Sequence, residues 1–216
     1  MKQIHRDART IWDISPPVSQ LSPTFPGDTP YSQRWSCTIG EQCPVNVSAV
    51  TLSPHVGAHA DAPLHFSTDG ATAGRLDLEP FLGPCRVMHA LDCYPLIEIE
   101  HVLPYLDGAP PRLLVRTCRR AAVDAWSDRF AAYAPDTVRF LAERGVMLIG
   151  LDTPSIDPAA SKTLDSHRMI LKHDMRVLEN LVLDHVPAGD YELIALPLAW
   201  IQADASPVRA VLRALS

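Results

Sequence analysis

The amino-acid sequence predicts a mixed α/β fold in which strands outnumber helices. Two continuous apolar runs, residues 146–151 and 191–196, are bounded by turn-forming residues and are typical of buried strands. Twenty prolines stand against ten glycines, which favours short elements joined by fixed turns, because proline ends both helices and strands. The chain has 216 residues, 47% of them apolar, and we expect a single domain over residues 1–216.

Four further strands are predicted along the chain. The segment 45–52 is marked by the alternation of Val45, Val47 and Ala49 with polar neighbours, a period of two that fits a half-buried strand. Between the first two of these strands, the prolines of residues 25–30 predict a fixed loop. The four strands are expected at residues 11–14, 45–52, 85–91 and 112–116.

Two helices are predicted in the second half. Residues 135–144 begin with Pro135, which suits a first turn, and end before Gly145, while Val138 and Leu141 face inward. Residues 173–184 carry an apolar stripe at helical spacing. Glu179 would lie on the flank of that stripe, partly buried and in need of a partner.

Composition excludes several classes of protein. A net charge of −6 argues against a nucleic-acid partner, since a phosphate backbone requires a basic face. There is no apolar run of about 18 residues for a membrane helix, and residues 1–7 lack an apolar signal core. The five cysteines are scattered, without a C-x-x-C pair, so a disulfide framework is poorly supported and a reduced, cytoplasmic compartment is expected.

A group of ionisable residues marks the segment 54–66. His55, His59, Asp61 and His65 all have odd numbers, so an extended chain would place them on one side. A straight strand would hold His55 and His59 roughly 13 Å apart, too far to share an ion, so the chain must bend, and Gly57 is the residue able to bend it. Buried structural histidines are the alternative, but burying four such groups unpaired costs several kcal/mol.

These residue types indicate a metal site. Imidazole and carboxylate are ligands that borderline divalent metals such as zinc prefer. Two imidazoles and one carboxylate make an incomplete set, which leaves room for water, as catalytic sites require.

A second polar group follows the apolar run that ends at Leu151. His167 and Glu179 would be about 18 Å apart if both lay on one helix. To serve the same site, His167 must therefore belong to the loop before the second helix, with Asp165 and Ser166 forming the turn and cap. For Glu179 alone, composition favours an ordinary helix-surface acid, and the alternative for His167 is an ordinary loop histidine. On spacing alone these two residues rank below the first group.

The motif His55-x-Gly57-Ala58-His59-x-Asp61-x-Pro63-x-His65 resembles the H-x-G-T-H-x-D-x-P-x-H signature of the cyclase-like metal-dependent hydrolases. Similarity to the bacterial kynurenine formamidases of that family extends over nearly the whole chain. The segments that carry it are residues 12–16, 26–30, 151–155, 163–167, 178–181 and 191–198.

This resemblance implies a homodimer with a swivelling β/β/α fold, in which helices flank a mixed sheet. It implies two divalent metal ions per subunit, usually zinc. One ion would take His55, His59 and Asp61. Asp61 would bridge to a second ion bound by His167, and Glu179 would contribute to both.

The resemblance also implies the chemistry. His65 would be the catalytic acid/base, and the reaction would be hydrolysis of N-formyl-L-kynurenine to L-kynurenine and formate in tryptophan degradation. His65 as a third imidazole ligand, or as a core histidine, is the alternative. Other activities left open are an isatin-hydrolase-like amidase and a metal-binding protein without catalysis.

Two positions depart from the family pattern. Ala58 stands where the signature has threonine, which removes a hydroxyl. Phe25 stands where the subfamily places a tryptophan against the substrate, so Phe25 is expected to bind the substrate ring with a smaller face and no indole N–H. Trp12 is the other candidate for that contact.

Overall fold

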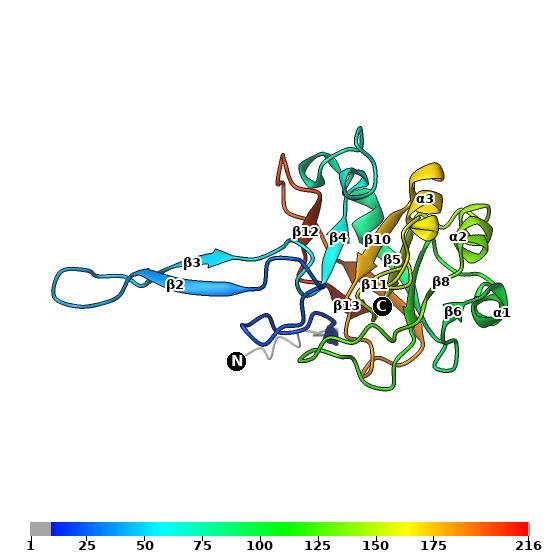
Figure 1. The fold of residues 1–216 in the computed structure, drawn as a ribbon. Coiled ribbons are helices and arrows are strands. Elements are labelled where there is room, and N and C mark those ends of the chain that lie inside the picture. Colours follow the sequence, from blue (N-terminus) through cyan, green and yellow to red (C-terminus); the bar gives the residue numbers. More distant parts are fainter. Residues whose placement is uncertain (1–9, 216) are drawn as a thin grey trace, which may run out of the picture.

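A computed structural model describes residues 10–215, and the segment 1–7 considered above lies outside them. Within this range nine strands form one mixed sheet, in the order β1-β13-β11-β5-β7-β9-β10-β4-β12 (Figure 1). They are β1 (Ile11–Asp13), β4 (His59–Asp61), β5 (Leu82–His89), β7 (Arg112–Arg116), β9 (Leu148–Leu151), β10 (Arg176–Glu179), β11 (Gly189–Ile194), β12 (Ala205–Pro207) and β13 (Val211–Ala214).

The sheet is parallel in its middle and antiparallel at both sides. β5, β7, β9 and β10 run parallel, whereas β4 and β12 on one side, and β11, β13 and β1 on the other, pair antiparallel. The mixed α/β prediction is therefore confirmed, and all six predicted strands are present within a few residues of their expected bounds.

The sheet is strongly curled. β12 and β13 lie seven positions apart in the strand order but are joined by only residues 208–210. Four backbone steps span at most about 14 Å, whereas strands seven positions apart in a flat sheet would be separated by roughly 34 Å. The two ends of the sheet must therefore approach each other, and a core is enclosed between them.

Alternation along the central strands divides the apolar residues between two cores. In β7, Leu114 packs into the core enclosed by the curled sheet, while Leu113 and Val115 pack into a second core on the other face. α2 (Pro135–Ala142) and α3 (Asp165–Lys172) cover this second core, as does the short α1 (Ile99–Val102). Near them, β6 (Leu96–Ile97) pairs with β8 (Ala132–Tyr133), and the 3₁₀ turns are η1 (Pro63–His65), η2 (Ala73–Arg75), η3 (Glu79–Phe81) and η4 (Leu103–Tyr105).

One of the two predicted helices is confirmed and the other is wrong. α2 begins at Pro135 and buries Val138 and Leu141, as expected. Residues 173–184 are not helical, because the chain reverses at Asp174 (φ 50°) and then forms β10 in parallel with β9. All four residues of β10 are buried, so apolar side chains fall on both faces of the strand. In sequence, such a run resembles the apolar stripe of a helix. Pairing with β9 makes it a strand.

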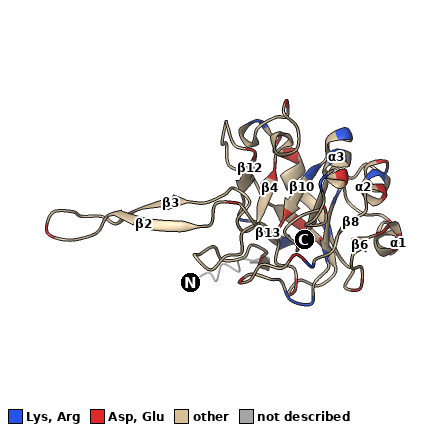
Figure 2. Cartoon of the chain, viewed as in Figure 1, with Lys and Arg blue, Asp and Glu red and all other residues tan. Residues whose placement is uncertain are grey.

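A long hairpin, here called the arm, projects from the body (Figure 1). It comprises β2 (Ser32–Cys37), β3 (Val47–Thr51) and the loop between them. Arg34 and Glu41 are the only charged residues in the segment 32–51, and Figure 2 shows the contrast with the body, over which both charges are interspersed.

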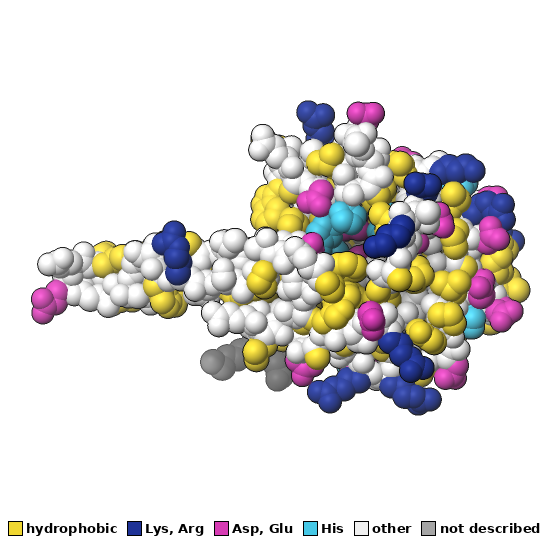
Figure 3. Space-filling model, in the orientation of Figure 1, with side chains coloured by type: hydrophobic (Ala, Val, Ile, Leu, Met, Phe, Trp, Pro, Cys, Tyr) yellow, Lys and Arg dark blue, Asp and Glu magenta, His cyan; other side chains and the backbone are white. Residues whose placement is uncertain are grey.

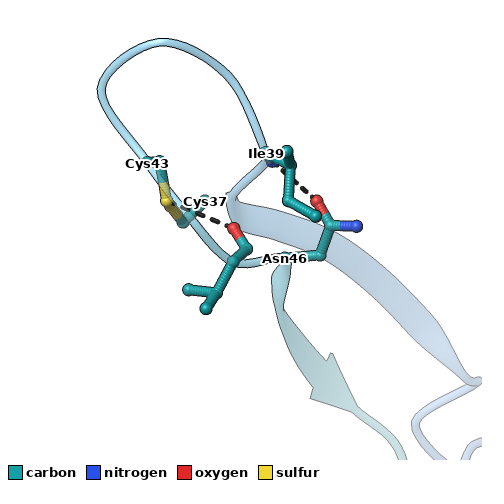
Figure 4. Close-up of a disulfide and its surroundings, with 5 residues drawn as sticks. Cys37, Ile39, Cys43 and Asn46 are labelled. Carbon is teal, nitrogen blue, oxygen red and sulfur yellow. Dashed lines mark hydrogen bonds between the residues drawn. A yellow bond between two sulfur atoms is a disulfide. The ribbon is translucent and has the colours of Figure 1, made fainter.

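A disulfide closes the tip of the arm. Cys37 and Cys43 are joined there, and the Ile39 N–H donates to Asn46 Oδ1 at 2.7 Å across the same loop (Figure 4). The expectation that the cysteines are unpaired is wrong for this pair, because the hairpin brings together two thiols whose spacing in sequence gives no signal. The prediction of a reduced compartment loses the support of that argument, and a cytoplasmic location stays a prediction.

Candidate metal centre

The bend predicted at Gly57 brings the first two histidines together. Gly57 has φ +74°, a conformation that favours glycine, and the ring centroids of His55 and His59 lie 4.9 Å apart. β4 follows at once, so His59 and Asp61 point to the same side of the sheet, as residues two apart in a strand do.

Asp61 lies at the centre of the site. Its Oδ1 is 3.1 Å from His55 Nδ1 and 3.4 Å from His59 Nε2, whereas its Oδ2 is 3.3 Å from His167 Nε2. The two oxygens of one fully buried carboxylate therefore face different imidazoles, and Asp61 links two groups of ligand atoms.

Glu179 reaches the same two groups from β10. It lies directly opposite His59 in the antiparallel pairing of β10 with β4, and such cross-strand pairs point to the same face. Its Oε2 is 3.3 Å from His59 Nε2, and its Oε1 is 3.7 Å from His167 Nε2. Glu179 thus converges on the site from a strand, where a helix had been predicted.

His167 is buried in the first turns of α3. The prediction of a loop position for it is wrong, since Asp165 begins the helix, and the preceding Leu164 makes no side-chain cap. The helix starts where Asp157 accepts hydrogen bonds from the backbone N–H groups of Ser166 and His167, both at 3.0 Å. This carboxylate takes over the capping role expected of Asp165.

Each of the three central imidazoles is held through its outer nitrogen. His59 Nδ1 is 3.0 Å from the Gly57 carbonyl oxygen, and His167 Nδ1 is 2.6 Å from Asp157 Oδ2. His55 Nε2 is 3.0 Å from Asp204 Oδ2. In all three rings the other nitrogen faces Asp61. Histidines that bind metals show this arrangement, because an outer acceptor fixes the ring and its tautomer.

The residues present fit a divalent cation. In the described part of the chain, His59 Nε2 and Asp61 Oδ1 are buried without a hydrogen-bond partner, although each has a polar atom within 3.4 Å. Unpaired buried polar atoms cost about 1–3 kcal/mol each, and an ion between them would remove that cost. Ligand atoms of His55, His59 and Asp61 all lie within 4.8 Å of one another, as do those of Asp61, His65 and His167.

The carboxylates of the centre favour the protonated form of the three histidines. Burial opposes a charge on His59 and on His167. The adjacent carboxylates of Asp61 and Glu179 outweigh this at His59, those of Asp157 and Asp61 outweigh it at His167, and the pKa of each ring rises to about 10. Burial likewise opposes a charge on His55, and the carboxylates of Asp204 and Asp61 beside the ring raise its pKa to about 9.

The pKa of Asp61 shifts in the opposite direction. Burial would raise the pKa of Asp61, yet the three imidazoles beside it, with His167 the first of them, hold that pKa well below its usual range. These shifts favour imidazolium groups around an ionised carboxylate.

His65 stands at the edge of this cluster. It lies on η1, and one third of its side chain is exposed, in contrast to the buried His59 and His167. Its ring is 4.3 Å from that of His55 and 5.9 Å from that of His167. Figure 3 shows histidine side chains gathered at a hollow on the body.

The hollow is the mouth of a cavity of about 450 Å³. His55, His65, His167 and Glu179 line one part of it. An aromatic wall lines another part, where Phe25 and Trp126 meet edge to face with ring centroids 4.9 Å apart.

Trp12 does not belong to this wall. It packs on Tyr191 with ring centroids 5.0 Å apart, and it is not among the residues that line the cavity. The prediction of a substrate contact for Trp12 is therefore wrong. Ala58, at the position of the signature threonine, is buried in the enclosed core.

Sequence reasoning missed three residues of the site. Asp157 follows the apolar run of β9 closely, and its position in a polar stretch after a buried strand is a signal that could have assigned it. Asp204 is a single acid before a short strand, and Trp126 lies in an irregular segment. Nothing local distinguishes those two.

Comparison with known proteins identifies the family. A sequence profile described as putative cyclase matches residues 12–158. Kynurenine formamidase from Bordetella petrii is 68% identical over 207 residues, which is 96% of this chain and 99% of that protein. The chain belongs to the kynurenine formamidase branch of the cyclase family.

Solved structures agree with this membership. A potential metal-dependent hydrolase with cyclase activity aligns with a TM-score of 0.82 at 27% identity, covering 97% of this chain and all of that one. Isatin hydrolase A from Labrenzia aggregata aligns with a TM-score of 0.79 at 23% identity, over 96% of this chain and 94% of that one. The second likeness shows a shared fold.

Proposed function

We propose that this chain is a divalent-metal-dependent amide hydrolase that converts N-formyl-L-kynurenine and water into L-kynurenine and formate in tryptophan degradation. The observation that carries the proposal is the position of Asp61, whose two oxygens face different imidazoles beside a cavity. The 68% identity to a relative named kynurenine formamidase supports the choice of substrate.

Two ions would be held by five residues. His55 and His59 would bind one ion and His167 the other, while Asp61 and Glu179 would each give one oxygen to either side. Mixed imidazole and carboxylate donors favour zinc. Ions held there would polarise the formyl oxygen of the substrate and activate a water molecule for attack.

We propose His65 as the group that moves the proton. It lines the cavity and is the most exposed of the four clustered histidines. The imidazole would accept a proton from the attacking water and deliver it to the departing aryl amine as the C–N bond breaks. The attacked carbon carries only hydrogen, so this end of the cavity needs little space.

The rest of the cavity suits an aromatic amino acid. Phe25, with Trp126 behind it, would pack on the aryl ring of the substrate. Arg129 and Lys162 also line the cavity, and their positive charges suit the carboxylate of kynurenine. Isatin carries no carboxylate, so these cations favour formylkynurenine over isatin.

One set of assays tests the proposal. Purified protein should release formate from N-formylkynurenine, turn over isatin poorly, and lose activity when a chelator removes its metal. An active preparation that contains no metal, or one that prefers isatin, would refute it.

Two variants test the division of roles. His65→Asn should lower kcat by about 10²–10⁴-fold and leave the metal content unchanged. His59→Asn should lose metal and activity together. If His65→Asn emptied a metal site, His65 would be a third imidazole ligand, and if it kept full activity the proton-transfer role would be wrong.

We also propose that the protein is a homodimer. The arm supports this, because an isolated two-stranded ribbon is only marginally stable in water, and the arm exposes Trp35, Val47 and Val50. A second copy packed on this surface would cover them. Light scattering should give about twice the 23.7 kDa of one chain, and a monomer at micromolar concentration would contradict the proposal.

Among the residues that the structure describes, no helix is long and apolar enough to cross a membrane.

A further inference from the structure

One carboxylate outside the proposed ligand set contacts two histidines of the site. Asp204 Oδ2 is 3.0 Å from His55 Nε2 and 3.2 Å from His65 Nδ1. Both contacts have hydrogen-bonding geometry, and a carboxylate can only accept. Each histidine must therefore carry a proton on the nitrogen that faces Asp204.

We infer that Asp204 is a positioning residue that fixes the tautomers of His55 and His65 together. With its proton on Nε2, His55 can give the lone pair of Nδ1, which lies 3.1 Å from Asp61 Oδ1, to a metal ion. With its proton on Nδ1, His65 keeps Nε2 free to accept a proton. The inference rests on the proposed function, in which the first nitrogen binds metal and the second takes the proton of water.

Backbone pairing positions Asp204 beside the two histidines. It immediately precedes β12, which pairs with β4 so that Ala205 lies opposite Asp61. The Asp204 carbonyl accepts from the Ala62 N–H at 2.9 Å. The strand pair that positions Asp61 thus also positions Asp204.

The cavity is lined by the two histidines, His55 and His65, and not by Asp204. We therefore expect Asp204 to act on a molecule in the cavity through the two rings that it contacts.

Asp204 could instead be a metal ligand with His55 and His65, since their ligand atoms lie within 4.8 Å of one another. The hydrogen bonding argues against this. Both contacts of Asp204 are satisfied by protons, whereas Asp61 Oδ1 and His59 Nε2 are buried without a hydrogen-bond partner within residues 10–215. An ion between Asp61 and the imidazoles would supply the missing partner.

The test uses zinc-loaded protein labelled with ¹⁵N in its histidine rings. Long-range ¹H–¹⁵N spectra report which ring nitrogen carries the proton, and His65→Asn identifies the His65 signals. We expect His65 protonated on Nδ1 in the wild type and a mixture of both tautomers in Asp204→Asn. Unchanged signals of His55 and His65 in Asp204→Asn would overturn the inference.

Kinetics provides the second readout. Partners of this kind typically affect metal affinity or activity by about 10–100-fold, so Asp204→Asn should lower kcat by that factor and leave KM unchanged. Asp204→Glu keeps the charge and should recover part of the loss. The matched control is Asp190→Asn on β11, whose carboxylate is 38% exposed against 40% for Asp204. A similar loss of kcat in the control would count against a specific role.

The two proposals can fail separately. If the protein does not hydrolyse formylkynurenine, the ring signals still test the role of Asp204. If a spectrum places zinc on His65 Nε2 while Nδ1 keeps its proton, the proposed role of His65 fails and that of Asp204 stands. Loss of the Nδ1 proton in the wild type would refute the role of Asp204.

Discussion

Filling the metal centre should release about three protons per chain. Metal ligands must be deprotonated, and the metal-free structure raises the pKa of His55 to about 9 and those of His59 and His167 to about 10. At pH 7 such rings are roughly 99% protonated or more, so each would lose nearly one full proton. Asp61, whose pKa is lowered, contributes none.

The number of protons released is large because the histidines are already clustered with carboxylates before the metal binds. Three isolated imidazoles with the ordinary pKa of 6.5 would each be only about 24% protonated at pH 7 and would release roughly 0.7 proton in all. Because protons compete with the metal, raising the pH must tighten binding. The apparent affinity should rise by up to about three orders of magnitude per pH unit between pH 7 and 9.

Isothermal titration calorimetry measures the release directly. Zinc is titrated into metal-free protein at pH 7 in buffers of different ionisation enthalpy, and the slope of heat against that enthalpy gives the number of protons. His185→Asn, a change to an exposed ring paired with Asp184, should leave the number unchanged. A release below one proton in the wild type would refute the reasoning.

The same pKa shifts predict that the metal-free chain loses stability at high pH. The folded-state values lie above the unfolded value of 6.5, so this stabilisation is full below pH 6.5 and is lost as the pH rises through about 9 to 10. The melting temperature of the zinc-free protein should fall over that pH range. In the zinc-loaded protein, the three histidines should cause no such fall. Asp61→Ala should cost more bound metal than His167→Ala by elemental analysis, since Asp61 faces both groups of ligands. Gly150→Ala should destabilise the fold by about 1–3 kcal/mol in denaturant titrations, because a Cβ there would lie 2.6 Å from Leu114 Cδ2; an unchanged midpoint would contradict the packing described.

Local pattern was sufficient for much of the fold and for the first half of the site. Period-two alternation and apolar runs located the strands, and the need to bend the chain between His55 and His59 pointed to Gly57, which does adopt a positive φ. These features depend on neighbours in sequence.

The second half of the site depends on pairing between distant segments. Glu179 faces His59 because β10 pairs with β4, and Asp204 approaches His65 because β12 pairs with β4 on its other side. Neither pairing leaves a local signal. The buried residues of β10 could equally form a helix in isolation, which is why residues 173–184 were assigned wrongly.

The pairing of β1 with β13 has a consequence for synthesis of the protein. Ile11 lies opposite Arg213, so the first strand has no partner until some two hundred residues have followed it from the ribosome. β12, which covers the edge of β4, leaves the ribosome only shortly before β13 does. Unpaired strand edges tend to associate with other chains, and pairings so distant in sequence form slowly. The nascent chain therefore carries two open edges through nearly all of its translation, and the histidines and carboxylates of the centre are assembled only when the last strands dock.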